Sequence, residues 1–206
     1  METLEFGPLE GKKLTVVFAK KVDNPSAEEI KHLKSLIEEY NPDFATEELG
    51  DREIDDFNKR DPYSSVFRDA GVLLYPVDIS EYAKTSISAI VDEKGKMADM
   101  VEASSVGGAD AEYIRAYADA LRVEYEELRV QEEISVRNDW MVKGILDCAN
   151  KVSKEDILCI FIGGPIHWEG MTKTLESIDV KVCTDPYFSP NKIRNTFMEM
   201  ESTELI

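Results

Sequence analysis

The sequence predicts an α/β fold in which a mainly parallel or mixed central sheet is flanked by helices, with a long helical segment in the middle of the chain. Short apolar runs occur at residues 13–18, 44–49, 72–77, 157–162 and 179–183, and each predicts a buried strand. Apolar residues at helical spacing lie between these runs. This alternation favours parallel strands joined by helical crossovers, within a single domain spanning residues 1–206.

The helix after the first strand has clear boundaries. Ser26 and Glu29 have the spacing of a capping box, and an apolar stripe that begins at Ile30 follows them. Asn41-Pro42 predicts the end of the helix, because proline cannot continue it and disfavours helical backbone in the residue before it. The second strand is expected directly afterwards.

The segment 109–152 contains no proline, and its apolar residues recur at helical spacing. A single helix of about forty residues would be roughly 60 Å long, which is much longer than a small domain. The segment therefore either breaks at the polar residues 131–133, or projects and pairs with another chain. Because so long an amphipathic stripe must bury its apolar side, we expect a homodimer formed through this segment.

The composition argues against several classes of protein. A hydrophobic share of 43% over 206 residues is enough for a core, so global disorder is not expected. A net charge of −18 disfavours nucleic acid and anionic membranes as partners, because both require a basic surface. No apolar run approaches the roughly 18 residues of a membrane helix. The N-terminus is acidic where a signal peptide would be basic, so we expect a cytoplasmic protein.

Four polar residues are candidates for chemistry because of their places relative to the predicted strands. Glu48 lies in the second strand and Asp78 ends the third. His167 follows the fourth strand, where a helix begins, and Arg137 lies in the central helical segment. Two carboxylates and an imidazole that meet at one sheet edge could bind a divalent metal or share acid–base chemistry. Alternatively, Asp78 caps a helix that starts near Ser80, and Arg137 pairs with carboxylates on its own helix.

These residues carry a resemblance to the TraB/Tiki family, which is related to ChaN-like and erythromycin-esterase-like proteins. In that family a Pro-Asp precedes a strand with Glu-Leu, another strand ends in Asp, and a helix with Arg and Met precedes a strand and Gly-x-x-His-x-x-Gly. Over residues 14–183 this chain has, in the same order, Pro42-Asp43, Glu48-Leu49, Val77-Asp78, Arg137 and Met141, and Gly164-Pro165-Ile166-His167-Trp168-Glu169-Gly170.

The resemblance implies a metal-assisted hydrolase that is similar to a peptidase. Glu48, His167 and Asp78 would then hold a manganese, cobalt or zinc ion. Glu48 and His167 would also be catalytic, together with Arg137, which would stabilise developing negative charge.

One family motif is missing. Where the family has its first Gly-x-x-His, this chain has Phe18-Ala19-Lys20-Lys21. A protonated ammonium group cannot bind a metal, so Lys21 would instead neutralise Glu48 or hold an anionic ligand. Lys21 is therefore a candidate substrate-binding residue, together with Gly163 and Gly164. These two glycines serve either as an anion cradle or in close packing at a tight turn.

Two functions remain open from the sequence. The first is a metal-dependent hydrolase with a degenerate site. The second is a pseudoenzyme, a non-catalytic member of the same fold that binds a small molecule, a peptide or a partner chain. Retention of most motifs favours the first function, whereas loss of one histidine favours the second. We expect weak or absent binding of manganese, cobalt and zinc.

Overall fold

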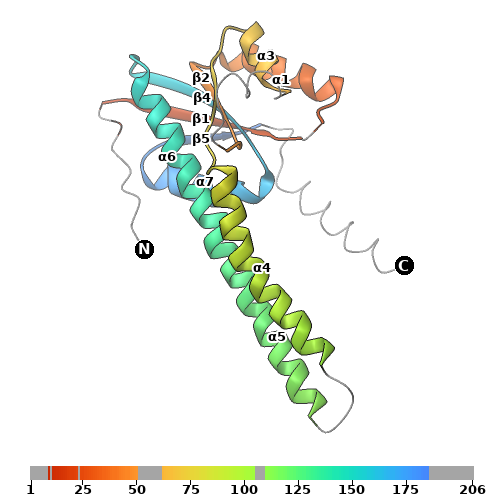
Figure 1. The fold of residues 1–206 in the computed structure, drawn as a ribbon. Coiled ribbons are helices and arrows are strands. Elements are labelled where there is room, and N and C mark those ends of the chain that lie inside the picture. The colour runs from red at the N-terminus through yellow and green to blue at the C-terminus, as the bar shows by residue number, and fades with distance from the viewer. Residues whose placement is uncertain (1–8, 10, 23, 51–61, 105–109, 186–206) are drawn as a thin grey trace. The chain divides into compact units, whose positions relative to one another are not determined.

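The computed structural model describes residues 9, 11–22, 24–50, 62–104 and 110–185, which contain one five-stranded sheet. All strands pair in parallel, in the order β3-β2-β4-β1-β5 (Figure 1). The α/β fold class is therefore confirmed, and every predicted strand has its counterpart in this sheet. The strands are β1 (Lys13–Lys20), β2 (Phe44–Glu47), β3 (Leu74–Pro76), β4 (Asp156–Gly163) and β5 (Lys181–Thr184).

The chain forms two compact units. The α/β unit comprises residues 1–78 and 139–206, and the helical unit comprises residues 79–138. The α/β unit contains the sheet and the helices α1 (Ala27–Tyr40), α3 (Ser64–Asp69), α7 (Pro165–Ser177) and most of α6 (Val136–Lys151). The helical unit contains α4 (Glu81–Ala103), α5 (Ala111–Leu128) and a π-helical segment, η1 (Arg129–Ser135).

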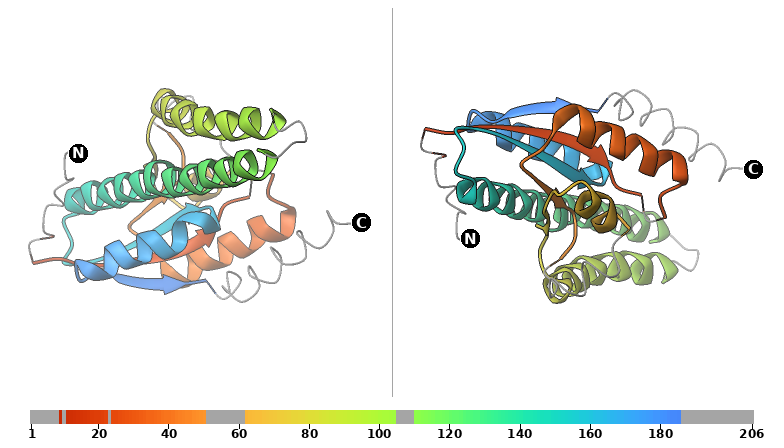
Figure 2. Two further views of the ribbon diagram at one scale, coloured as in Figure 1. Left: turned by 90° about the horizontal axis from the view of Figure 1, so that it is seen from below. Right: turned by 90° about the horizontal axis from the view of Figure 1, so that it is seen from above.

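Helices cover both faces of the sheet. Helices α1 and α3 pack on one face, where Leu33 and Phe67 belong to the same buried cluster as Ile160. Helices α6 and α7 pack on the other face, where Met171 belongs to the cluster of Phe161. Successive strand residues such as Ile160 and Phe161 point to opposite faces. A strand buried on both sides must therefore be apolar throughout, which is why β4 has an unbroken apolar run. Figure 2 shows α7 and α1 on opposite sides of the sheet.

The second strand is shorter than predicted, because it ends at Glu47 instead of Leu49. The Leu49 N–H donates to the Glu47 carbonyl oxygen at 2.7 Å, which closes a three-residue turn centred on Glu48. The Glu48 N–H still donates to the Ile162 carbonyl oxygen of β4, at 2.8 Å. Glu48 thus lies just beyond the end of the strand. The alternation of side chains between the two faces of the sheet therefore does not determine the direction of its side chain.

The predicted central helix is present and runs from Ala111 to Lys151 without ending. Residues 131–133, where a break was one of the two alternatives, lie within η1. The wider turn of a π-helix accommodates an extra residue there without interrupting the helix, and such segments are usually short. The polar stretch therefore corresponds to a change of helix type and not to a helix end.

The apolar stripe of α5 is covered by α4 within the same chain. Val91 and Ala98 of α4 are buried, as are Ala118 and Leu121 of α5. The ring of Tyr125 lies so close to Gly95 that a Cβ atom there would be 3.3 Å from it, so the glycine permits close packing of the two helices. No described helix is long and apolar enough to cross a membrane.

The capping box predicted for α1 is present in full. The Ser26 hydroxyl accepts from the Glu29 N–H at 3.3 Å, and the Glu29 carboxylate accepts from the Ser26 N–H at 2.8 Å. Hydrogen bonds from the Ser26 N–H and hydroxyl lower the pKa of Glu29. The contribution of Glu29 to stability is therefore complete above its unfolded pKa and is lost as the pH falls through its folded pKa.

Replacing Ser26 by alanine is expected to lower the free energy of unfolding at pH 7 by about 1 kcal/mol, because one N–H of the first turn loses its acceptor. The loss is expected to become smaller as the pH falls through the folded pKa of Glu29. Urea unfolding at a series of pH values measures both effects. Ser35→Ala is the matched control, because the Ser35 hydroxyl donates to the Lys31 carbonyl within the same helix and caps nothing. Equal losses in both variants would contradict the capping role.

Candidate functional site

The carboxyl ends of β1 and β4 lie side by side, and the chain leaves them toward opposite faces of the sheet. Lys20 of β1 pairs with Gly163 of β4 at the last position of the ladder. Helix α1 follows β1 on one face, and α7 follows β4 on the other. In open parallel sheets, ligands bind in the crevice at such a switch point. The topology therefore supports a ligand site at the sheet edge that the sequence indicated.

Lys21 follows β1 directly and places its ammonium group at this edge. Its Nζ lies 3.2 Å from the Glu47 Oε1, and it also donates a hydrogen bond to the Glu48 carbonyl oxygen. The Glu47 side chain is 1% exposed, so its carboxylate would carry a large desolvation cost without a counter-charge. Lys21 therefore neutralises Glu47, and not Glu48 as one sequence alternative proposed.

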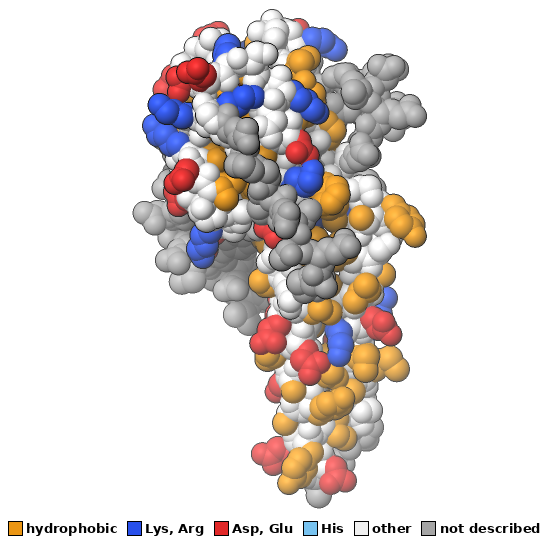
Figure 3. Space-filling model, turned by 90° about the vertical axis from the view of Figure 1, so that its left-hand side faces the viewer, with side chains coloured by type: hydrophobic (Ala, Val, Ile, Leu, Met, Phe, Trp, Pro, Cys, Tyr) orange, Lys and Arg blue, Asp and Glu red, His pale blue; other side chains and the backbone are white. Residues whose placement is uncertain are grey.

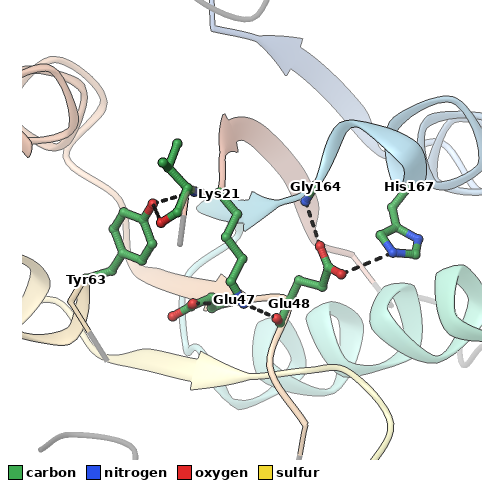
Figure 4. Close-up of polar contacts among 7 residues, drawn as sticks. Lys21, Glu47, Glu48, Tyr63, Gly164 and His167 are labelled. Atoms are coloured by element: carbon green, nitrogen blue, oxygen red, sulfur yellow. Dashed lines mark hydrogen bonds and ion pairs between the residues drawn. The ribbon is translucent and has the colours of Figure 1, made fainter. Parts of the chain in front are cut away.

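Glu48 and His167 meet at the same edge, as the sequence predicted. The His167 Nε2 lies 3.2 Å from the Glu48 Oε1, and the Glu48 Oε2 accepts a hydrogen bond from the Gly164 N–H at 2.6 Å (Figure 4). The carboxylate thus lies at the N-terminus of α7, where the helix dipole favours negative charge. His167, in the first turn of α7, is fully buried. We call Lys21, Glu47, Glu48, Gly164 and His167 the strand-end site.

The two glycines have different roles in the structure. A Cβ atom on Gly163 would lie 2.3 Å from the Cε1 of the Phe161 ring, so close packing of that ring requires a glycine. A Cβ atom on Gly164 would lie 3.1 Å from the Glu48 Oε2. Gly164 therefore keeps the carboxylate within reach of its own N–H. Of the two sequence alternatives, the contacts support close packing at Gly163 and a carboxylate-binding N–H at Gly164.

The strand-end site provides two donors at a suitable separation for one metal ion. In tetrahedral sites with bonds of about 2.0–2.2 Å, neighbouring ligand atoms are roughly 3.3–3.6 Å apart. The next carboxylate, Glu47, is paired with the Lys21 ammonium, whose charge opposes binding of a cation. Within the described residues, no group of three His, Cys, Asp or Glu side chains could hold a metal ion. The described donors therefore do not by themselves make up a first-row metal site, which generally needs three protein ligands.

The other two candidates lie on other segments of the chain, since Asp78 follows β3 and Arg137 lies in α6. Asp78 is buried, and its N–H donates to the Leu49 carbonyl oxygen at 2.9 Å. It is not the cap of the following helix, because the side chain of Ser80 accepts from the Ala83 N–H of α4. Arg137 lies in the first turn of α6 and belongs to the helical unit.

Glu47 is the member of the site that sequence reasoning missed. Neighbouring strand residues point to opposite faces, and only Glu48 was expected to face the site. In a parallel sheet covered on both faces, however, a strand with neighbours on both edges is buried on both sides, and β2 is buried along its whole length. A glutamate in such a strand needs a partner, and this requirement is the signal that could have identified Glu47.

A second polar pair lies at the carboxyl edge of the sheet. The His32 Nε2 is 2.6 Å from the Oδ2 of Asp185, which directly follows β5 and is buried. The pair lines a small cavity of about 60 Å³ whose walls are mostly apolar. No local pattern predicts this pair, because 153 residues separate its members. The cavity is lined by Ala19, Lys20, Val22, Glu29, His32, Leu33, Leu36, Tyr63, Ile162 and Asp185.

Comparison of the chain with protein-family models, with curated proteins and with solved structures finds no match. The resemblance to the TraB/Tiki family therefore depends on the ordered motifs alone.

Proposed function

We propose that this chain is a non-catalytic, partner-binding protein in which the helical unit presents the binding surface. One observation carries the proposal. Of the twelve large hydrophobic side chains that are exposed among the described residues, nine belong to the helical unit. Monomeric proteins seldom expose large contiguous apolar patches, and such patches usually mark interaction sites. Figure 3 shows hydrophobic side chains along the helical unit on the face toward the viewer.

In this proposal, the strand-end site has a structural role. The Lys21 ammonium contacts Glu47 and a backbone carbonyl, and the Glu48 carboxylate accepts a hydrogen bond from the Gly164 N–H and lies 3.2 Å from His167 Nε2. These contacts join the ends of β1, β2 and β4 to the start of α7. Buried polar networks of this kind define one arrangement of the elements that they join.

A metal-assisted hydrolase is the second candidate function. The observation in its favour is the separation of 3.2 Å between Glu48 Oε1 and His167 Nε2, which is close to that of two ligands on one metal. A metal there would polarise a substrate carbonyl or activate a water molecule. Lys21 opposes this function, because a positive charge lies where the family has a histidine.

Titration calorimetry of the untagged protein with manganese, cobalt and zinc distinguishes the partner-binding function from the metal-assisted hydrolase. We expect no sub-micromolar binding, because two ligands next to an ammonium group cannot hold these ions tightly. Lys21→His is expected to bind more tightly, because it adds an imidazole and removes the charge. Circular dichroism must first show that this variant is folded, because Lys21 also neutralises Glu47.

His167→Ala and Glu48→Gln are the controls, since each removes one of the two donors. Sub-micromolar binding by the unmodified protein that both variants lose, together with metal-dependent hydrolysis of peptides, would overturn the proposed function. Binding that both variants retain would come from other groups and would leave the strand-end site without a metal.

A further inference from the structure

Helix α5 has two apolar faces. The first faces α4 and includes the buried residues Ala118 and Leu121. The second is exposed, and its residues recur at intervals of three or four positions. At 100° per residue, its centre lies roughly 120° around the helix from the buried face. The exposed face comprises Tyr113, Ala116, Tyr117, Ala120 and Val123 of α5, and Val130 of η1 continues it.

Helix α4 repeats this arrangement. Val91 and Ala98 are buried and seven residues apart, whereas Ile90 and Met97 are exposed and also seven residues apart. Met100, one turn beyond Met97, is 74% exposed. The exposed face again lies roughly 120° around the helix from the buried face, in the same rotational sense as in α5. Apolar repeats of seven residues are typical of helices that pack side by side in bundles.

Ion pairs between the two helices define their register. The Lys94 Nζ lies 3.1 Å from the Glu124 Oε2, and the Arg122 Nη2 lies 3.9 Å from the Asp99 Oδ1. The helices are therefore antiparallel, and Met97 lies level with Val123. In an antiparallel pair, two faces offset in the same rotational sense lie on the same side. The seven residues Ile90, Met97, Met100, Tyr113, Tyr117, Val123 and Val130 thus form one surface, which we call the second seam.

The second seam is large enough for a stable interface. Its two tyrosines are 79% and 56% exposed, which corresponds to roughly 200–350 Å² of surface. The five other residues are each 42–74% exposed. Together the seven residues approach the roughly 800 Å² per partner that a standard interface buries.

We propose that the second seam binds the same seam of a second copy of this chain, so that the two helical hairpins form a four-helix bundle. This inference rests on the proposed partner-binding function and names the partner. A two-helix hairpin with a second apolar face lacks two helices to complete a bundle, and a second copy supplies both with the same seven-residue spacing. Two-fold symmetry, the commonest in soluble oligomers, places identical surfaces against each other.

Acidic residues in the second seam predict how the dimer responds to salt. Glu93 and Glu127 lie within the exposed faces of α4 and α5, and Glu124 lies beside Tyr117 on the second face. In a dimer these carboxylates approach their counterparts, and each chain carries a net charge of −18. Salt screens this repulsion, so the dimer is expected to be tighter at high salt. A basic partner helix would instead bind more weakly as salt is added.

Sedimentation equilibrium of the full chain is the test, with Ile90→Glu/Val123→Glu as the variant. Both side chains are exposed, and glutamate favours a helix more than isoleucine or valine, so the helices are expected to remain folded. The unmodified chain is expected to be a dimer of 23.3 kDa subunits at about 50 µM. The variant is expected to raise the dissociation constant roughly 100-fold or more, because it places carboxylates at the centre of the seam.

Arg115→Glu is the matched control, because it changes the net charge by the same −2 at an exposed position of α5 outside the second seam. It is expected to remain a dimer. A monomer of unmodified chain at all concentrations, or equal dimerisation of all three proteins, would overturn the second-copy proposal. Either result differs from failure of the proposed function, which would appear as a metal site and hydrolysis.

Discussion

Replacing Lys21 by methionine is expected to lower the free energy of unfolding of the α/β unit by about 3 kcal/mol. The substitution keeps an unbranched side chain of similar length but removes the charge that lies 3.2 Å from the buried Glu47 carboxylate. An uncompensated charge at a site that is 1% exposed costs several kcal/mol, whereas the pair itself contributes little net stability. Urea unfolding at pH 7 measures the loss.

Two further variants make this expectation specific. Lys20→Met is the matched control, because Lys20 is the neighbouring residue and is exposed. It is expected to change the free energy of unfolding by less than about 0.5 kcal/mol. The double variant Lys21→Met/Glu47→Met is expected to recover most of the lost stability, because removal of both charges leaves no buried charge without a partner. A double variant that is as unstable as Lys21→Met would show that Lys21 does not act through Glu47.

Gly163→Ala is expected to lower the free energy of unfolding by about 1–3 kcal/mol. The new methyl group would lie 2.3 Å from the Cε1 and 2.5 Å from the Cζ of the Phe161 ring. The ring cannot move away easily, because it is buried and packs edge-on against Phe18 with ring centroids 5.2 Å apart. Chemical unfolding and the melting temperature both report the effect.

Gly164→Ala is the comparison that separates packing from an anion-binding role. Among the atoms that the structure describes, its Cβ atom would meet only the Glu48 Oε2 within 3.4 Å, at 3.1 Å. The Glu48 side chain is 15% exposed and can shift by a few tenths of an ångström. We therefore expect a smaller loss than for Gly163→Ala. If the two glycines were an anion cradle without packing constraints, both substitutions would leave stability unchanged. That outcome would contradict the packing role assigned to Gly163.

The elements that could be predicted are those whose cause lies in neighbouring residues. The apolar run of β4 requires burial on both faces, and Ser26 with Glu29 satisfies the first turn of α1 locally. Their boundaries were predicted to within one residue. The end of β2 could not be predicted, because the turn at Glu48 depends on hydrogen bonds to β4, more than a hundred residues away. The π-helical segment η1 contains residues 131–133, where a break was one of two alternatives, and a change of helix type could not be predicted from polarity alone.

The sequence predicted where the candidate site lies, but it did not predict all the interactions within the site. Glu48 and His167 were placed at one sheet edge because the carboxyl ends of parallel strands meet there, and the structure brings them to 3.2 Å. The partner of Lys21 was wrong in the sequence alternative that named Glu48. Choosing between two adjacent glutamates requires the direction in which each side chain leaves the strand end, and that depends on a turn closed by Leu49.

By itself, the sequence determined the α/β class, the five strands, the long central helix and the position of His167 at a junction of strand and helix. Burial of apolar runs and capping of helix ends act over a few residues, so these features can be read from local patterns. Only the tertiary structure decided that Lys21 pairs with Glu47, that Glu48 binds the start of α7, and that α4 covers one face of α5 and leaves the second seam exposed. Each of these outcomes depends on strand order and helix register, which result from many contacts between residues far apart in the chain.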